Sequence, residues 1–408
     1  MKPLIWLFEA VILNYLKDFA MPLLALKKHL TEVMLPVWLK RAFDDKASQF
    51  VEALSLDGDH TRSTVVRTRT AARQIYVFAN AYCRNAAPIG ALDKAQIAFE
   101  NLKSICWVPG ERAGFARSYD LATSRVVDPE IDLYDQSCVL LALAWLFKAT
   151  GNSGYKSIVD ETLCAIDKTL AADFGGWAET ASGDLPRRQN PHMHFFEACL
   201  ALWEIDGSYT YVTRAREIFA LFQAQFYDRE FGLLREFFGP AWEISKEYGS
   251  DRIEPGHMAE WVWLIRRYEK LAKGDHTQLC ANLLASSQRC RSGSFTPFIL
   301  DEVFDDGSIS KNTRRLWPQI ELLKAYVAEY TAQNDPINLD RARQLATQIM
   351  TEYLSHTPHG MWRDCFDGSG NFVANSIPGS SAYHLWTIVA DLDLEGIEIS
   401  SFAARETC

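Results

Sequence analysis

Apolar stretches with a helical pattern recur along this chain at nearly constant spacing, and each begins with polar residues. Six of them are predicted to be helices, at 65–83, 133–150, 191–205, 256–271, 314–330 and 382–392. His194, His257 and His384 follow the same spacing, because the second gap between them is twice the first to within one position. A regular repeat of this kind indicates that one helical unit is used several times.

The same step brings further polar positions into register, at 67–73, 135–136 and 317–319. Between the apolar stretches, more amphipathic helices are predicted at 92–104, 153–171, 208–226, 275–289 and 338–354. The step is about 60 residues, whereas open helical solenoids use shorter repeats, of about 34 to 47 residues. The sequence therefore predicts an all-α fold, an (α/α)6 barrel with six inner and six outer helices. Its inner helices would present one end to a common cavity.

No linker rich in Gly, Ser or Pro divides the chain, so we expect a single barrel domain over residues 25–408 that carries the catalytic site. Residues 1–24 are expected to form an N-terminal extension or helix. Glu9, Lys17 and Asp18 interrupt the apolar character of this segment, and no cleavage site of small residues stands out, which argues against a signal peptide. The segment is also too short and too charged to span a membrane.

Charge and cysteine content narrow the class of protein. The net charge is −10, and an acidic chain without a Lys/Arg stripe is not expected to bind nucleic acid. Nine cysteines, an odd number without a Cys-x-x-Cys motif, are predicted to be reduced thiols of a cytoplasmic protein. The oligomeric state is left open, with a homodimer as one alternative.

The motif NPHMH, from Asn190 to His194, is predicted to start a helix, with Asn190 as N-cap and Pro191 in the first helical position. His192 and His194 then point in different directions, which argues against a shared metal ion. His194 shares its face with Glu197 and is expected to be neutral at a helix N-terminus. The alternative is a capping turn that carries its imidazoles by chance.

A closed barrel would gather His194, His257 and His384 around one pocket, and three kinds of chemistry are considered for it. A zinc site is disfavoured because no H-E-x-x-H motif or carboxylate-bracketed cluster accompanies the histidines. Glycoside hydrolysis needs two carboxylates flanking the scissile bond. Three carboxylates near the register remain available for it: Asp135, Glu254 and Glu260.

The third kind is proton transfer at a carbon next to a sugar carbonyl. It requires a base with a pKa near neutrality, a second acid or base, and a donor for the enediolate oxygen. His257, His384, His194 and Arg73 provide these groups without a metal or cofactor. Pro255-Gly256 is expected to break the chain before His257, and Glu260 on the same helix face can orient that histidine or bind a hydroxyl. The alternative is that these residues are buried polar groups with a structural role.

Five segments, taken together and in order, resemble the N-acylglucosamine 2-epimerase superfamily, and most closely its mannose isomerase and aldose–ketose isomerase branch. They are ARQIYVFANAY, DLYDQSCVLLALA, RRQNPHMHFFEACLAL, EPGHMAEWVWLI and LWPQIELLKA. The resemblance spans about residues 25–392. It implies an (α/α)6 barrel and cofactor-independent proton transfer at C2 of an aldose.

The resemblance also implies roles for individual residues. His257 and His384 would be the acid/base pair, and Arg73 would hold substrate oxygens. The other substrate-binding residues would be Asn190, His194, Glu260 and Trp317, with Gln319 added from the same register. Gln136 stands where many members of the family carry histidine.

The expected function is interconversion of an aldose and a ketose, D-mannose and D-fructose, with a small-molecule sugar as substrate. An isomerase can work with one base on one face of an enediol, whereas a 2-epimerase must protonate C2 on the opposite face. Residue types do not distinguish these two geometries, so N-acylglucosamine or cellobiose-type 2-epimerisation is the main alternative. A glycoside hydrolase and a non-catalytic binding protein are the others.

Overall fold

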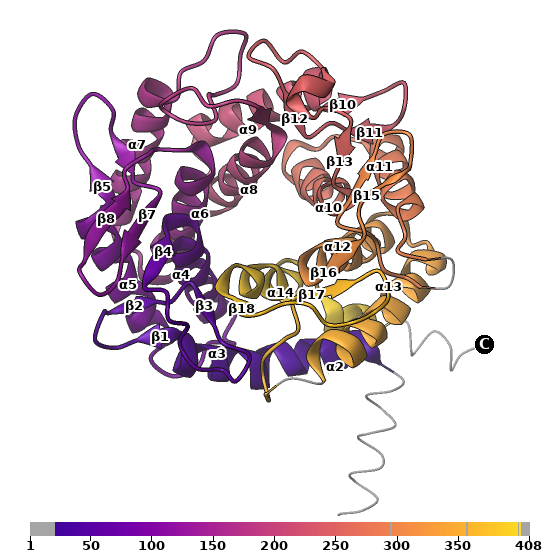
Figure 1. The fold of residues 1–408 in the computed structure, drawn as a ribbon, viewed down its shortest axis with the longest axis horizontal. Coiled ribbons are helices and arrows are strands. Elements are labelled where there is room, and N and C mark those ends of the chain that lie inside the picture. Colours follow the sequence, from indigo (N-terminus) through magenta and orange to yellow (C-terminus); the bar gives the residue numbers. More distant parts are fainter. Residues whose placement is uncertain (1–20, 294–295, 356–357, 399, 401–408) are drawn as a thin grey trace, which may run out of the picture.

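A computed structural model describes residues 21–293, 296–355, 358–398 and 400. Residues 1–20, for which an extension or helix was expected, lie outside the described residues. The last eight residues of the predicted domain lie outside them as well. Within them, helices are arranged as two concentric rings (Figure 1). The predicted (α/α)6 barrel is confirmed.

The inner ring consists of long helices that the sequence pattern had indicated. They are α4 (Thr68–Cys83), α6 (Leu133–Thr150), α8 (Gln189–Asp206), α10 (Pro255–Ala272), α12 (Leu316–Gln333) and α14 (Gly379–Asp391). From Leu133 to Leu146, nearly every residue of α6 is buried, because an inner helix is covered by its neighbours and by the outer ring. This all-round burial explains why α6 is apolar on nearly every side.

The outer helices are α5 (Ala91–Cys106), α7 (Ser153–Thr169), α9 (Tyr209–Leu221), α11 (Thr277–Arg289) and α13 (Pro336–Ile349). Two of them continue as π-helical turns, η2 (Phe222–Phe226) and η4 (Met350–Leu354). The ring is completed by α2 (Pro22–Lys28), the π-helical η1 (His29–Met34) and α3 (Leu35–Ala42). Helix α2 begins shortly before the domain start predicted at residue 25, and its Leu23 is fully buried.

Short antiparallel strands lie in the loops that precede the inner helices. The pairs are β1 (Phe43–Asp44) with β2 (Gln49–Phe50), β5 (Trp107–Val108) with β6 (Gly114–Phe115), β9 (Arg187–Arg188) with β12 (Phe237–Phe238), β10 (Tyr227–Asp228) with β11 (Leu233–Leu234), β16 (Thr313–Arg315) with β17 (Cys365–Asp367), and β3 (Ala53–Leu54) with β18 (Ile377–Pro378). Two sheets have three strands: β4 (Val65–Arg67), β7 (Ser118–Asp120) and β8 (Arg125–Asp128), and β13 (Arg252–Ile253), β14 (Glu302–Phe304) and β15 (Ile309–Lys311). A 3-10 turn, η3 (Lys246–Tyr248), lies in one of these loops.

These strands explain two differences from the predicted helix starts. Val65–Arg67 pairs with Ser118–Asp120, so α4 begins only at Thr68. Arg187–Arg188 is also a strand, and the chain passes from it directly into α8 at Gln189, with Arg188 at the N-cap position. The prediction of Asn190 as N-cap is therefore wrong, because the helix has already begun one residue earlier.

Buried amide and imidazole side chains attach the loops to the inner helices. Gln136 accepts a hydrogen bond from the backbone N–H of Phe115 at 2.8 Å and donates to the carbonyl of the same residue at 2.9 Å. Gln319 makes the same pair of bonds to Ile299, at 2.9 and 3.0 Å. His192 accepts from the backbone N–H of Trp177 at 3.1 Å. Three inner helices thus hold their neighbouring loops in place by hydrogen bonds between a buried side chain and the loop backbone.

The ring closes where the last inner helix meets the first. The indole N–H of Trp386 in α14 donates to Asn80 Oδ1 in α4 at 3.0 Å, and β18, which directly precedes α14, pairs with β3. Near the outer edge, the backbone N–H of Leu23 donates to Glu398 Oε1 at 3.1 Å. Segments from opposite ends of the sequence therefore complete one wall.

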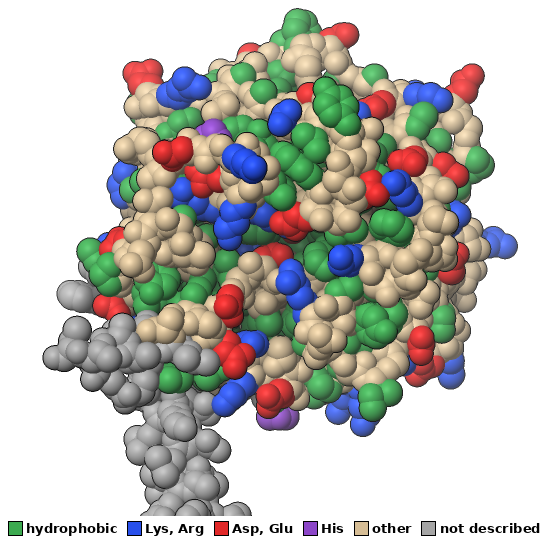
Figure 2. Space-filling view, turned by 180° about the vertical axis from the view of Figure 1, so that it is seen from behind, with side chains coloured by type: hydrophobic (Ala, Val, Ile, Leu, Met, Phe, Trp, Pro, Cys, Tyr) green, Lys and Arg blue, Asp and Glu red, His purple; other side chains and the backbone are tan. Residues whose placement is uncertain are grey.

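Two properties of the described residues bear on the expected class of protein. No helix among them is both long and apolar enough to cross a membrane. The face opposite the one in Figure 1 carries interspersed basic and acidic side chains (Figure 2). This face gives no support to a nucleic-acid-binding surface, which would need a field of positive charge.

We expect the ring-closing bond to contribute measurably to stability. Asn80→Ala leaves the buried indole N–H of Trp386 without its acceptor, which should lower the free energy of unfolding by about 1 to 3 kcal/mol. Urea unfolding followed by circular dichroism measures this. The exposed Asn375→Ala serves as control and should leave the midpoint unchanged. Equal midpoints for both variants would show that the closing bond is energetically neutral.

Candidate active site

A cavity of about 320 Å³ opens at the end of the barrel where the inner helices begin. It is lined by every predicted site residue except Gln319: Arg73, Asn190, His194, His257, Glu260, Trp317 and His384. Gln319 is fully buried, and its amide is occupied by the bonds to Ile299 and by a further bond to the carbonyl of Arg315 at 3.0 Å. The structure thus brings together all but one of the predicted residues.

His194 is held from both sides. Its Nδ1–H donates to Glu197 Oε2 at 3.2 Å, and Nη2 of Arg73 donates to its Nε2 at 3.1 Å. Its ring stacks on Tyr134 with 4.8 Å between centroids. Burial lowers the pKa of His194 to about 4, with Arg73 adding to the effect and Glu197 opposing it. The neutral state expected from the sequence agrees with this environment, although burial is its main cause.

His257 has a different environment. Its Nδ1–H donates to Glu236 Oε2 at 3.0 Å, and Glu254 Oε2 lies 3.8 Å away. Burial acts against the charged form, but the two carboxylates outweigh it and raise the pKa of His257 to about 9. The surroundings of His257 therefore favour its imidazolium form. The carboxylates that orient it come from the loop before α10 and not from Glu260.

His384 is oriented by a carboxylate as well, but it stays neutral. Its Nδ1–H donates to Glu321 Oε1 at 2.6 Å. Burial lowers its pKa well below the usual value, and the positive charges of Arg73 and Lys324 lower it further. The other oxygen of Glu321 accepts from the indole N–H of Trp263 at 2.9 Å.

The three histidines therefore share one arrangement, in which Nδ1 faces a glutamate and Nε2 faces away from it. Within the described residues, Nε2 of His257 and Nε2 of His384 have no hydrogen-bond partner, whereas that of His194 is taken by Arg73. Both free nitrogens belong to residues that line the cavity. The two histidines that the sequence predicted to be catalytic are thus the two that can exchange a proton with a bound molecule.

Trp317 forms the wall between these two histidines. Its ring centroid lies 5.0 Å from that of His257 and 5.4 Å from that of His384. A Cβ atom at Gly256 would lie 2.7 Å from the indole ring, so only glycine leaves room for it. Gly256 lies inside α10, which begins at Pro255, and so it does not break the chain before the helix as expected.

Arg73, Glu260 and Asn190 offer unpaired polar atoms. Arg73 donates to the hydroxyl of Tyr134 at 2.8 Å, and its Nε has no partner among the described residues. The same holds for both carboxyl oxygens of Glu260 and for Oδ1 of Asn190. Burial, followed by the nearby charge of Glu321, raises the pKa of Glu260 well above its usual value. Buried polar groups without partners in a cavity indicate a polar ligand.

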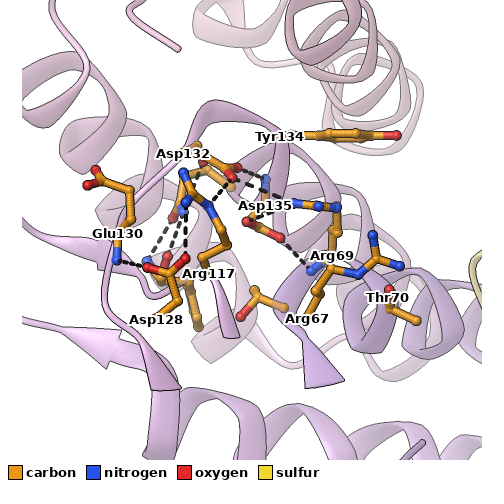
Figure 3. Close-up of polar contacts among 12 residues, drawn as sticks. Arg67, Arg69, Thr70, Arg117, Asp128, Glu130, Asp132, Tyr134 and Asp135 are labelled. Carbon is orange, nitrogen blue, oxygen red and sulfur yellow. Dashed lines mark hydrogen bonds and ion pairs between the residues drawn. The ribbon is translucent and has the colours of Figure 1, made fainter. Parts of the chain in front are cut away.

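A network of arginines and aspartates lies at the start of α6 (Figure 3), and Arg69 connects it to the lining of the cavity. Asp135 accepts from the backbone N–H of Arg69 at 2.7 Å and lies within 3.4 Å of its guanidinium. Arg117 pairs with Asp128 and Asp132, each at 3.0 Å. Asp135 is fully buried and does not line the cavity. It is therefore unavailable as a carboxylate for glycoside hydrolysis.

Two groups of side chains have the spacing of a metal site, with ligand atoms within 4.8 Å of one another. They are Glu236, Glu254 and His257, and Glu260, Glu321 and His384. In both groups Nδ1 of the histidine bonds a carboxylate directly, which orients the imidazole. The expectation of a metal-free site stays a prediction.

One protein family matches most of this chain. The sequence pattern of the N-acylglucosamine 2-epimerase (GlcNAc 2-epimerase) family matches residues 49–388. A mannose-6-phosphate isomerase of Rhizobium meliloti (strain 1021) is 31% identical over 374 residues, which cover 89% of this chain and 95% of that protein.

Two solved structures show the same fold. A cellobiose 2-epimerase from Spirochaeta thermophila DSM 6192 has a TM-score of 0.81 at 19% identity, over 93% of this chain and 97% of the other. A D-mannose isomerase has a TM-score of 0.80 at 17% identity, over 89% and 96%.

Fold, cavity and relatives define a sugar isomerase or epimerase. The chain belongs to the N-acylglucosamine 2-epimerase family, as the resemblance of its five segments indicated.

Several groups of the site escaped the sequence analysis. Glu321 lies one step of the repeat after His257 and one step before His384, so strict use of the register would have found it. Tyr134 lies within the DLYD segment, in which only Asp135 was considered as a site residue. Glu236 lies in a loop, where no periodic signal marks it.

The charge of His257 can be measured directly. In Glu236→Gln the stronger of its two carboxylate partners is lost, so the pKa of His257 should fall from about 9 by about one unit or more. NMR of protein labelled with ¹³C at histidine follows this titration. Glu254→Gln should cause a smaller decrease, because Glu254 is farther away and more exposed. An unchanged titration in Glu236→Gln would contradict the assigned ion pair.

Proposed function

We propose that this enzyme interconverts D-mannose and D-fructose, with His384 as general base and His257 as general acid. The observation that carries the proposal is the unlike surroundings of the two histidines on either side of Trp317. Two carboxylates lie beside His257, whereas the carboxylate that bonds His384 is paired with Lys324, and the two pKa values are shifted in opposite directions. Such a divergence is how one site provides an acid and a base together.

The proposed reaction begins from the open-chain aldose. Nε2 of His384 takes the proton from C2 while Nε2–H of His257 donates a proton to the carbonyl oxygen O1, which gives an enediol. His384 then returns its proton to C1, and His257 takes the proton from O2, so that a carbonyl forms at C2. Both histidines end in their starting states, and no cofactor takes part.

The remaining residues of the cavity would bind the sugar. Arg73, a buried cation whose hydrogen bonds all go to neutral groups, can stabilise the negative charge that develops on O1 and O2. Asn190 and Glu260 have the unpaired atoms that sugar hydroxyls require. Glu260 would donate as a carboxylic acid, in line with its raised pKa. His194 would add rigidity by holding Arg73 in place.

A free sugar fits the cavity better than a phosphorylated one. The cations at its mouth are each paired with a carboxylate: Arg67 with Glu52, Arg69 with Asp135, Arg315 with Asp301, and Lys311 with Glu302. Little positive charge is left there for a phosphate.

The pattern of cysteines supports a cytoplasmic location, and eight of the nine are described and unpaired.

Incubation with D-mannose in D2O tests the substrate. We expect D-fructose to form, with deuterium entering at C1 or C2, observed by NMR. Parallel tubes contain D-mannose 6-phosphate, N-acetylmannosamine and cellobiose. Deuterium at C2 of an epimeric aldose would assign the enzyme to 2-epimerisation, and turnover of the phosphate ester alone would overturn the preference for a free sugar.

Substitution of the two histidines tests their roles. His257→Ala and His384→Ala should each lower kcat by a factor of about 10² to 10⁴, the contribution of a general acid or base. Their thermal unfolding should change little, since both side chains border the cavity. The exposed His359→Ala is the control and should keep full activity. Normal turnover by either active-site variant would refute the assignment.

A further inference from the structure

Lys324 is a buried cation in the middle of the barrel. It lies in α12, one turn beyond Glu321, and its side chain is completely inaccessible to solvent. Its Nζ donates to Glu321 Oε2 at 2.7 Å and to the hydroxyl of Thr387 at 2.9 Å, and it lies 4.0 Å from the ring centroid of Trp263. A fully buried ammonium is rare and costs several kcal/mol unless it is paired.

The position of Lys324 recurs on the other inner helices. It lies one step of the repeat after Glu260, two steps after Glu197 and one step before Thr387. These positions form a layer one turn below the histidines. At this position α8 carries Glu197 and α10 carries Glu260, whereas α12 carries Lys324. The helix that contains Glu321 therefore has a cation where two other inner helices have an acidic residue.

The glutamates that orient His257 and His384 differ in whether a cation bonds them. Glu236, which orients His257, has a second carboxylate nearby in Glu254, and no Lys or Arg bonds it among the described residues. Glu321, which orients His384, bonds the Lys324 ammonium through its other oxygen. At His257, whose glutamate has no cationic partner and whose second ring nitrogen is free, the carboxylates favour the protonated imidazole.

We propose that Lys324 is the positioning residue that allows Glu321 to orient His384 while leaving Nε2 of His384 free as a base. The ammonium compensates the charge of Glu321, so the carboxylate accepts the Nδ1–H bond without drawing a second proton to the ring. The inference rests on the proposed function, in which His384 accepts the C2 proton.

Other charged and titratable groups face His384 as well, and they must be held constant in a test. They are Arg73 from α4, His194 and Glu197 from α8, Glu260 from α10, and Tyr383 from α14 itself. Arg73 and His194 act in the same direction as Lys324, and Glu197 acts against it. Lys324 also favours the charged forms of Glu197 and Glu260, so the shift that a variant at Lys324 causes includes the response of these two carboxyl groups.

The test compares Lys324→Met with the wild-type enzyme. Removal of the ammonium should raise the pKa of His384, and the acidic limb of kcat/KM should move to higher pH by about one unit or more. At a fixed pH below that limb, kcat/KM then falls by a factor of about ten. Lys324→Arg should keep the limb near its wild-type position, because it keeps the charge. Lys270→Met, on the exposed end of α10, is the control.

Histidine NMR gives a second measurement that needs no turnover. The titration of His384 should move to higher pH in Lys324→Met, while those of His194 and His257 move less. If the enzyme acts on none of the sugars, the proposed function fails, but this titration still tests the role of Lys324. An unmoved His384 titration overturns the inference even if mannose is isomerised.

A double variant covers the case in which Lys324→Met does not fold. Lys324→Met with Glu321→Gln removes both charges of the buried pair, so no uncompensated charge remains. It should lower kcat, because His384 loses its orienting carboxylate, but its acidic limb should stay near that of the wild type. A limb shifted to higher pH in the double variant would show that Lys324 acts on His384 by another route.

Discussion

Closing six apolar helices into a ring obliges the polar side chains at their first turns to find partners inside the protein. Water cannot reach most of them, and an unpaired buried donor or acceptor costs about 1 to 3 kcal/mol. Gln136 and Gln319 meet this demand by bonding loop backbone, and the histidines meet it by bonding glutamates. The groups left without partners, on Glu260, Asn190 and Arg73, then stand out as the places prepared for a ligand.

The same histidine–glutamate bond gives three different results, depending on what lies beside it. At His194 an arginine occupies the second ring nitrogen. At His257 a further carboxylate adds negative charge, and at His384 a buried lysine compensates the glutamate. The first neighbour is the same in all three, and the second neighbour adds to or opposes the effect of burial on each imidazole.

The sequence predicted the barrel because spacing is a property of the whole chain, and local exceptions do not disturb it. His194, His257 and His384 kept their register, and the helix predicted at 133–150 has those bounds in the structure. Errors arose where local rules compete. Asn190 is a good N-cap residue, but strand pairing at Arg187–Arg188 starts the helix earlier. Gln319 shares the register of the site, but its amide turns toward the loop at Ile299. Glu236 could not be predicted, because contacts across a loop leave no period.

The join between the first and last inner helices has a consequence for how the enzyme is made. Synthesis proceeds from the N-terminus, so α4 with Arg73 leaves the ribosome long before α14 with His384. Until α14 packs against α4, the wall at Trp386 and Asn80 is open and His384 is missing from the cavity. With His384 as the base, as proposed, a chain that lacks α14 would have no activity. Activity would then appear only when the ring closes around its own last helix.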